Sequence, residues 1–225
     1  MDEIKVDIPE FEPWTKYPAL TAERLAIMAD LIREVRHDAV LAHEPGKGDG
    51  NWGLGTRVYE RTCFKIEKLA EKSPDWLTIL HELKGLQFSF ALGNIPFRFY
   101  RGTPEEPPDR YSIRTFGEIH HLQLCLQLEG IRPLDKVLRF AVETSPATLE
   151  VTAVSVVEVD KAGSPVGVYE IPLKQRQESN VAVLQAPPVE LPSPAIELLT
   201  KIEEIAESEM NGTRAQSAKA NTGTK

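Results

Sequence analysis

The residues best suited to binding a ligand are concentrated between His43 and Arg61, in the sequence HEPGKGDGNWGLGTRVYER. The glycines of this stretch, which leave backbone N–H groups accessible to a ligand, are Gly46, Gly48, Gly50, Gly53 and Gly55. Thr56 is a suitable N-cap for a helix over about 57–72, and the free N–H groups of a helix N-terminus favour an anion. Arg57 and Arg61 would add charge-assisted hydrogen bonds to a phosphate or carboxylate. The stretch therefore predicts an anion-binding corner.

Two standard phosphate-binding patterns are absent from this corner. The sequence has no G-x-x-x-x-G-K-[S/T] pattern, and no predicted strand precedes the glycines, as a dinucleotide fingerprint requires. The alternative interpretation is a glycine-rich connection between two helices, in which Trp52 and Leu54 fill a hydrophobic gap. Under the ligand interpretation, His43, Glu44 and Glu60 are the acid–base candidates. The hypothetical ligand-binding set is Gly53, Gly55, Thr56, Arg57, Glu60, Arg61, Arg98 and Arg101.

A second group of arginines follows later in the chain and consists of Arg98, Arg101, Arg110 and Arg114. Such a group suits a phosphate, a nucleic-acid backbone or an acidic partner, and Tyr100 and Tyr111 could stack on bases. The alternative is local ion pairing, because four acids lie nearby: Glu105, Glu106, Asp109 and Glu118. The formal net charge of −8 and the pI of about 5.3 argue against nucleic-acid binding.

Metal-binding and catalytic patterns are not found in the sequence. There is no H-E-x-x-H and no paired C-x-x-C, and His120 and His121 would point about 100° apart on a helix. There is no G-x-S-x-G, and the spacing Glu82-Leu83-Lys84 precedes a strand rather than lying within one. Both cysteines, Cys63 and Cys125, lie in apolar-periodic segments, which predicts buried free thiols. The sequence thus assigns no catalytic residue, no metal and no cofactor.

Hydrophobic periodicity predicts the elements that would position these residues. A helix is expected over 22–41, capped by Thr21, and the helix over 57–72 follows. Their apolar stripes are Leu25, Met28, Ile32, Val35 and Ala39 in the first, and Tyr59, Cys63, Ile66 and Ala70 in the second. A third helix should begin at 116, because Thr115 and Glu118 form a capping box. Alternating leucines over 122–128 leave a strand open there.

Strands are expected over 86–92, 95–101, 136–143, 148–159 and 166–173, with a short run at 181–184 as a possible edge. Gly93-Asn94 is a two-residue hairpin signal between the first two. The fold class predicted is α+β: N-terminal helices and one mid-chain helix packed on one side of a mainly antiparallel sheet of about five strands, plus a C-terminal amphipathic helix.

The predicted domain organisation has five parts: an extended N-terminal arm (1–20), a single α+β domain (21–185), a proline-rich spacer (186–194), a C-terminal helix (195–209) and a disordered tail (210–225). The apolar stripe of the C-terminal helix, formed by Leu199, Ile202 and Ile205, is a hypothetical partner-binding surface; the alternative is that the helix packs back on its own domain.

The acidic N-terminus has no signal-peptide pattern, and no apolar run approaches the ~20 residues of a membrane span. We therefore expect a cytoplasmic protein of bacterial type with no membrane association. The leading functional hypothesis is a non-enzymatic accessory or regulatory protein that binds another protein, which includes a second copy of itself. The alternative is an enzyme or sensor for a phosphate-bearing small molecule or nucleotide at Gly46–Arg61. Nucleic-acid binding through Arg98–Arg114 is third.

Overall fold

The computed structural model describes residues 8–81, 87–129 and 135–174. The chain divides into two units, Met1–Arg176 and Gln177–Lys225, and every described residue lies in the first. Several predicted features lie outside the described residues: the run 181–184, the spacer 186–194, the helix 195–209 with Leu199, Ile202 and Ile205, and the tail 210–225.

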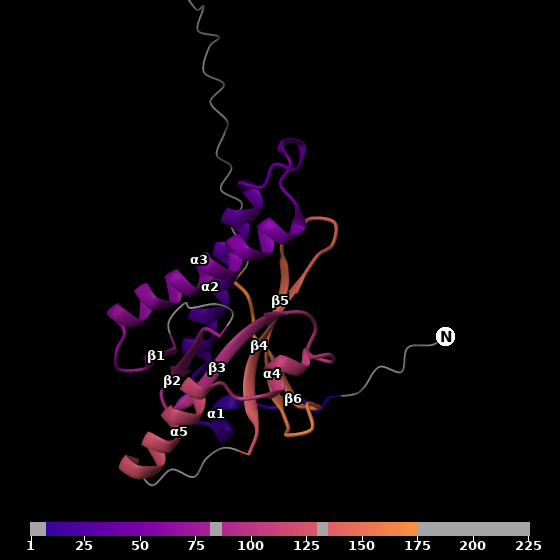
Figure 1. The fold of residues 1–225 in the computed structure, drawn as a ribbon. Coiled ribbons are helices and arrows are strands. Elements are labelled where there is room, and N and C mark those ends of the chain that lie inside the picture. Colours follow the sequence, from indigo (N-terminus) through magenta and orange to yellow (C-terminus); the bar gives the residue numbers. More distant parts are fainter. Residues whose placement is uncertain (1–7, 82–86, 130–134, 175–225) are drawn as a thin grey trace, which may run out of the picture. The chain divides into compact units, whose positions relative to one another are not determined.

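Six strands form one sheet in the order β1-β2-β3-β4-β5-β6 (Figure 1). They are β1 (Leu77–His81), β2 (Ser89–Leu92), β3 (Ile95–Arg101), β4 (Val137–Thr144), β5 (Val151–Val159) and β6 (Pro165–Glu170). Every neighbouring pair is antiparallel except β3 and β4, which are parallel. A parallel pair needs a long crossover connection, and the mid-chain helices provide it. The predicted α+β class with a mainly antiparallel sheet is confirmed.

The helices are α1 (Pro13–Lys16), α2 (Ala22–Leu41), α3 (Asn51–Lys72), α4 (Asp109–Ser112) and α5 (Phe116–Glu129), with a 3-10 turn, η1, at Pro45–Lys47. The Thr21 side chain caps α2 by accepting a hydrogen bond from the Arg24 N–H at 3.2 Å, as predicted. The capping box at the start of α5 is also confirmed. The Thr115 N–H donates to Glu118 Oε2 at 2.7 Å, and the Glu118 N–H donates to Thr115 Oγ1 at 3.3 Å. Residues 116–129 are therefore a helix and not a strand.

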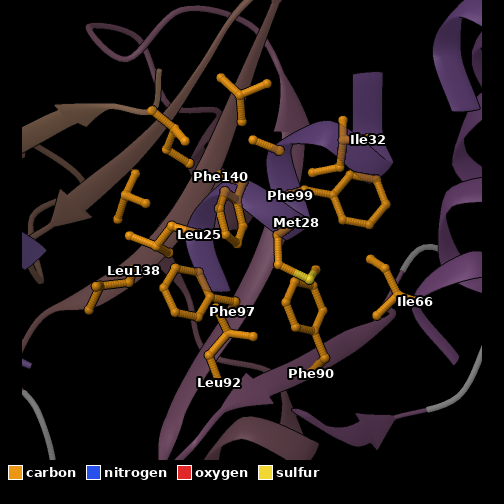
Figure 2. Close-up of a cluster of buried hydrophobic side chains, with 14 of the residues drawn as sticks. Leu25, Met28, Ile32, Ile66, Phe90, Leu92, Phe97, Phe99, Leu138 and Phe140 are labelled. Atoms are coloured by element: carbon orange, nitrogen blue, oxygen red, sulfur yellow. The ribbon is translucent and has the colours of Figure 1, made fainter. Parts of the chain in front are cut away.

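The main core lies between one face of the sheet and the two long helices (Figure 2). Leu25, Met28 and Ile32 of α2 are buried there beside Ile66 of α3. Alternate strand residues point into the same core because side chains along a strand alternate between faces. These include Phe90, Leu92, Phe97, Phe99, Leu138 and Phe140.

The opposite face is covered by α4 and α5, so the prediction that helices cover only one side of the sheet is wrong. Arg139, which alternates with Leu138 and Phe140 on β4, points to this second face. Its Nη1 donates to Glu118 Oε1 of α5 at 2.7 Å, and both side chains are almost fully buried. The β3–α5–β4 crossover explains the arrangement, because its helix must lie on one face of the parallel pair while α2 and α3 already occupy the other.

Candidate functional site

A cavity of about 560 Å³ lies at the carboxyl end of β3, bordered by α2, α3, α4 and β4. Sites for drug-sized molecules typically have volumes of roughly 300–1,000 Å³. The space exists because the end of β3 is not paired with β2: within the described residues, the β2–β3 pairing reaches only as far as Phe97. The last part of β3 therefore extends past β2 toward the α2–α3 pair.

Three arginines line the cavity: Arg36 from α2, Arg101 from the end of β3 and Arg110 from α4. Arg36 is 3 % exposed, and its Nε donates to the Leu149 carbonyl oxygen at 2.6 Å. Burial lowers the pKa of Arg36, the charge of Arg101 lowers it further, and Glu150 acts in the opposite direction. The Arg101 side chain makes no hydrogen bond or ion pair with a described residue. The charges of Arg36 and Arg101 thus act on each other at the cavity, and Arg101 has no acidic partner among the described residues.

Aromatic rings form much of the remaining wall. The Tyr59 and Phe99 ring centroids lie 5.4 Å apart, and those of Tyr100 and Tyr111 lie 5.3 Å apart. Burial raises the pKa of Tyr59 and of Tyr100, so both phenols are neutral at physiological pH. The Tyr100 hydroxyl donates to the Thr103 carbonyl oxygen at 3.1 Å. The wall therefore offers flat, uncharged surfaces beside the cationic groups.

Tyr111 is held in place by arginines on more than one side. The guanidinium carbons of Arg98 and Arg110 lie 4.5 Å and 5.0 Å from its ring centroid. Arg139 Nε donates to its carbonyl oxygen at 2.7 Å, and Arg98 Nη1 donates to the Arg110 carbonyl oxygen at 3.0 Å. The buried Arg98 thus supports the wall of the cavity rather than lining it.

The N-terminal part of α3 lines one side of the cavity, and it differs from the predicted corner. The helix begins at Asn51 with Gly50 as its N-cap, whereas the sequence predicted a glycine loop and a helix capped by Thr56. Thr56 is instead inside the helix, where its hydroxyl donates to the Trp52 carbonyl oxygen at 3.1 Å. Burial of Leu54, which is 3 % exposed, favours the longer helix over the low helix propensity of the glycines. The interpretation that Trp52 fills a gap is wrong, since it is 85 % exposed.

Gly55 lines the cavity from the middle of a helical turn. A Cβ atom added there would have no neighbour within 4 Å, so the space beside it is open. Glycine in a helix costs roughly 0.5–1 kcal/mol relative to alanine. The residue therefore leaves the wall open at some expense in helix stability.

Thr62 and Glu60 provide polar groups on the same helix. Thr62 is fully buried, and its Oγ1 has no hydrogen-bond partner among the described residues. Leaving a buried hydroxyl unpaired costs about 1–3 kcal/mol, so a molecule in the cavity is a suitable partner for it. Glu60 is exposed and is the one carboxylate among the described residues that line the cavity.

The structure brings together half of the predicted ligand-binding set. Gly55, Thr56, Glu60 and Arg101 line the cavity, whereas Gly53, Arg57, Arg61 and Arg98 do not. Arg57 faces the preceding loop: its Nη1 donates to the Ala42 carbonyl oxygen at 3.2 Å, and its Nη2 lies 3.7 Å from Asp49 Oδ2. The first helical turn after Thr56, where the sequence placed the anion, is thus not an open helix end.

Sequence reasoning missed Arg36, although a signal for it was present. The residue lies four positions after Ile32 and three before Ala39, which places it on the buried stripe of α2. A charged residue at such a position needs a partner or a polar cavity. The sequence placed Arg110 in a separate arginine group and gave Tyr111 only a base-stacking role, because nothing local connects a short helix to a site formed by α2 and α3.

The described residues form no metal-binding group, and their two cysteines are buried. No three His, Cys, Asp or Glu side chains there gather as a metal-binding group. Both cysteines are buried free thiols, as predicted, and burial raises the pKa of Cys63 to about 12. Cys125 Sγ lies 3.5 Å from His121 Nε2, one turn away on α5. None of the described helices is long and apolar enough to cross a membrane.

Comparison of the chain with protein-family models, with curated proteins and with solved structures finds no match. The function must therefore be inferred from the cavity and the surface.

Proposed function

We propose that this protein binds a small phosphate-bearing molecule in the cavity at the end of β3 and acts as a sensor or accessory protein. One observation carries the proposal: Arg36 and Arg101, from separate elements, line one aromatic-walled cavity in a chain whose net charge is −8. Guanidinium groups are the usual donors to phosphate and carboxylate because their N–H groups match the geometry of the oxygens. The buried hydroxyl of Thr62, which has no hydrogen-bond partner in the described part of the chain, also supports a bound molecule.

A non-catalytic role is favoured by the chemistry of the groups around the cavity. Burial keeps the phenols of Tyr59 and Tyr100 neutral, and the nearby thiol of Cys63 is neutral as well. A catalytic nucleophile or base usually has a pKa shifted toward neutrality, and these three are shifted away from it.

A thermal-shift screen of nucleotides and sugar phosphates tests the proposal. A ligand at a hundred times its Kd should stabilise the fold by about 2.7 kcal/mol. Arg101→Ala should abolish the response, because Arg101 lines the cavity and makes no hydrogen bond or ion pair with a described residue. Arg57→Ala is the matched control, since Arg57 lies outside the cavity. No responding compound, or equal loss in both variants, would refute the site.

The two helix glycines give a second, steric test. Added Cβ atoms at Gly55 and Gly53 both meet open space, but only Gly55 lines the cavity. Gly55→Leu should fold at least as stably as the parent and lose the ligand response, whereas Gly53→Leu should fold and keep it. Retention of the response by Gly55→Leu would place the ligand elsewhere.

Self-association through α5 is a second candidate function, favoured by the surface of that helix. On α5, Phe116, Ile119, Leu124 and Leu126 are 81 %, 44 %, 40 % and 44 % exposed, and Ile113, which lies between α4 and α5, is 70 % exposed. No Asp, Glu, Lys or Arg occurs over residues 119–128, so two copies of this acidic chain could meet there without like-charge repulsion.

Light scattering after size exclusion, over a range of concentrations, tests this second candidate. Phe116→Ser should shift a dimer toward monomer, whereas Phe64→Ser, at a 54 % exposed position on α3, should not. A parent protein that stays monomeric at high concentration would contradict self-association. The partner-binding role predicted for Leu199, Ile202 and Ile205 stays a prediction.

A further inference from the structure

The cavity combines two kinds of surface, and each constrains one part of the ligand. The cationic part consists of Arg36, Arg101 and Arg110, and the aromatic part includes Tyr59 and Phe99. Together they specify the charge and the shape of a ligand for the site of the proposed function, on which this inference rests.

The charge of the lining favours a doubly negative group. Three arginines and one glutamate, Glu60, line the cavity, which leaves two net positive charges. Glu150, which lies 2.8 Å from His37 Nδ1, offsets part of the Arg36 charge from outside the lining. A phosphate monoester carries a charge of about −1.5 to −2 at pH 7, whereas a carboxylate or a sulfate ester carries −1. Neutralising the net charge of this lining therefore favours the phosphate monoester.

The shape of the lining favours a flat ring attached to that phosphate. Tyr59 and Phe99 form one aromatic pair and Tyr100 and Tyr111 another, and both pairs contribute to the wall. Aromatic side chains bind planar rings by stacking with little dependence on which ring is present. Because Gly55 has no side chain, α3 does not fill the space beside these rings.

We propose that the ligand is a phosphate monoester that bears a planar ring, such as a nucleoside monophosphate. It binds as the dianion, with its phosphate held by Arg36 and Arg101 and its ring against the tyrosine and phenylalanine wall. The cavity thus selects for phosphate charge and for a ring together.

Titration calorimetry with four probes separates these two features. Adenosine 5′-monophosphate and phenyl phosphate have both, ribose 5-phosphate has no planar ring, and phenyl sulfate has a single fixed charge. At pH 7.5 we expect the first two to bind and each of the last two to bind at least tenfold more weakly. Gly55→Leu should remove all binding, and Gly53→Leu should not.

The pH dependence provides a further check on the dianion. The second ionisation of a phosphate ester has a pKa near 6, so about nine-tenths of the ligand is monoanionic at pH 5. Affinity for phenyl phosphate should fall about tenfold between pH 7.5 and 5.0, while that for phenyl sulfate should stay constant. Phenyl sulfate controls for titration of the protein, including His37 and the carboxylates of Glu60 and Glu150 near the arginines.

The possible failures can be told apart. Equal affinity for phenyl sulfate and phenyl phosphate at pH 7.5 would overturn the dianion while leaving an anion site in place. Equal affinity for ribose 5-phosphate and adenosine 5′-monophosphate would overturn the ring. If no probe binds and the thermal-shift screen is also negative, the proposed function itself fails, and this inference fails with it.

Discussion

Glu118 and Arg139 form the charged pair on which the wall of the cavity depends, and replacing Glu118 by glutamine tests their role. Both side chains are buried, and Arg139 also donates to the Tyr111 carbonyl oxygen. Burial lowers the pKa of Arg139 to about 10, although Glu118 acts in the opposite direction. Glutamine keeps the shape and the capping-box acceptor of Glu118 but removes its charge. The substitution therefore removes the counter-charge of Arg139, together with one acceptor for its guanidinium, while the cap is kept.

The expected cost is large because the guanidinium group is left buried without a counter-charge. Breaking such a pair costs about 3–5 kcal/mol, out of a total stability of typically 5–15 kcal/mol. With a urea m-value of about 2 kcal/mol per M, the unfolding midpoint should fall by roughly 1.5–2.5 M. Glu118→Ala should lose about a further 0.5–2 kcal/mol, because the cap is lost as well.

A double-mutant cycle in urea completes the test. Glu118→Gln combined with Arg139→Met should cost less than the sum of the two single changes, since the double variant leaves no buried unpaired charge. The reasoning would be refuted by a midpoint shift below about 0.5 M for Glu118→Gln at an unchanged m-value, where m is typically about 1–3 kcal/mol per M. Additive costs in the double variant would refute it as well.

Three further predictions concern other groups. Burial opposes the ionisation of Glu158, but hydrogen bonds from Lys16, Tyr17 and Lys136 lower its pKa, so its charge stabilises the fold above the unfolded pKa of about 4.3. In urea unfolding, Glu158→Gln should thus lower the free energy of unfolding by a constant amount above about pH 5 and by less below pH 4. A loss of stability that does not depend on pH would contradict this. The thiol of Cys63, neutral and fully buried, should react with Ellman's reagent only on unfolding, after that of Cys125, which is 8 % exposed. Because Trp52 is 85 % exposed beside the cavity, a bound probe should reduce acrylamide quenching of the parent but not of Trp52→Phe.

The sequence predicted most of the secondary structure because its signals are local. Thr21 and the Thr115–Glu118 box marked two helix starts correctly, and both caps are formed by residues three apart. The turn at Gly93 was also correct. Its φ is 60°, and an added Cβ would lie 2.6 Å from the Ala19 Cβ, so glycine is required there by both conformation and space.

The start of α3 was predicted wrongly because a tertiary contact determines it. Five glycines within ten residues indicate a loop by propensity, and Thr56 is a good cap by type. In the structure Leu54 is buried from within the helix, and this tertiary contact outweighs the local preference. The strand β1 was missed for a related reason: LTILH is a short run whose pairing with β2 is visible only once the sheet is formed.

The cavity itself was beyond sequence reasoning because its wall is assembled from distant elements. Arg36 and Arg101 are 65 positions apart in the chain, and their proximity depends on β3 extending past β2 toward α2. Only Arg36 carried a signal of its own, as an arginine on an apolar helical stripe. The role of Gly55 in the site therefore differs from the one predicted from the glycine-rich sequence around it. It does not contribute backbone N–H groups to an anion; it leaves out a side chain, so that the ring wall and the two guanidinium groups share one open space.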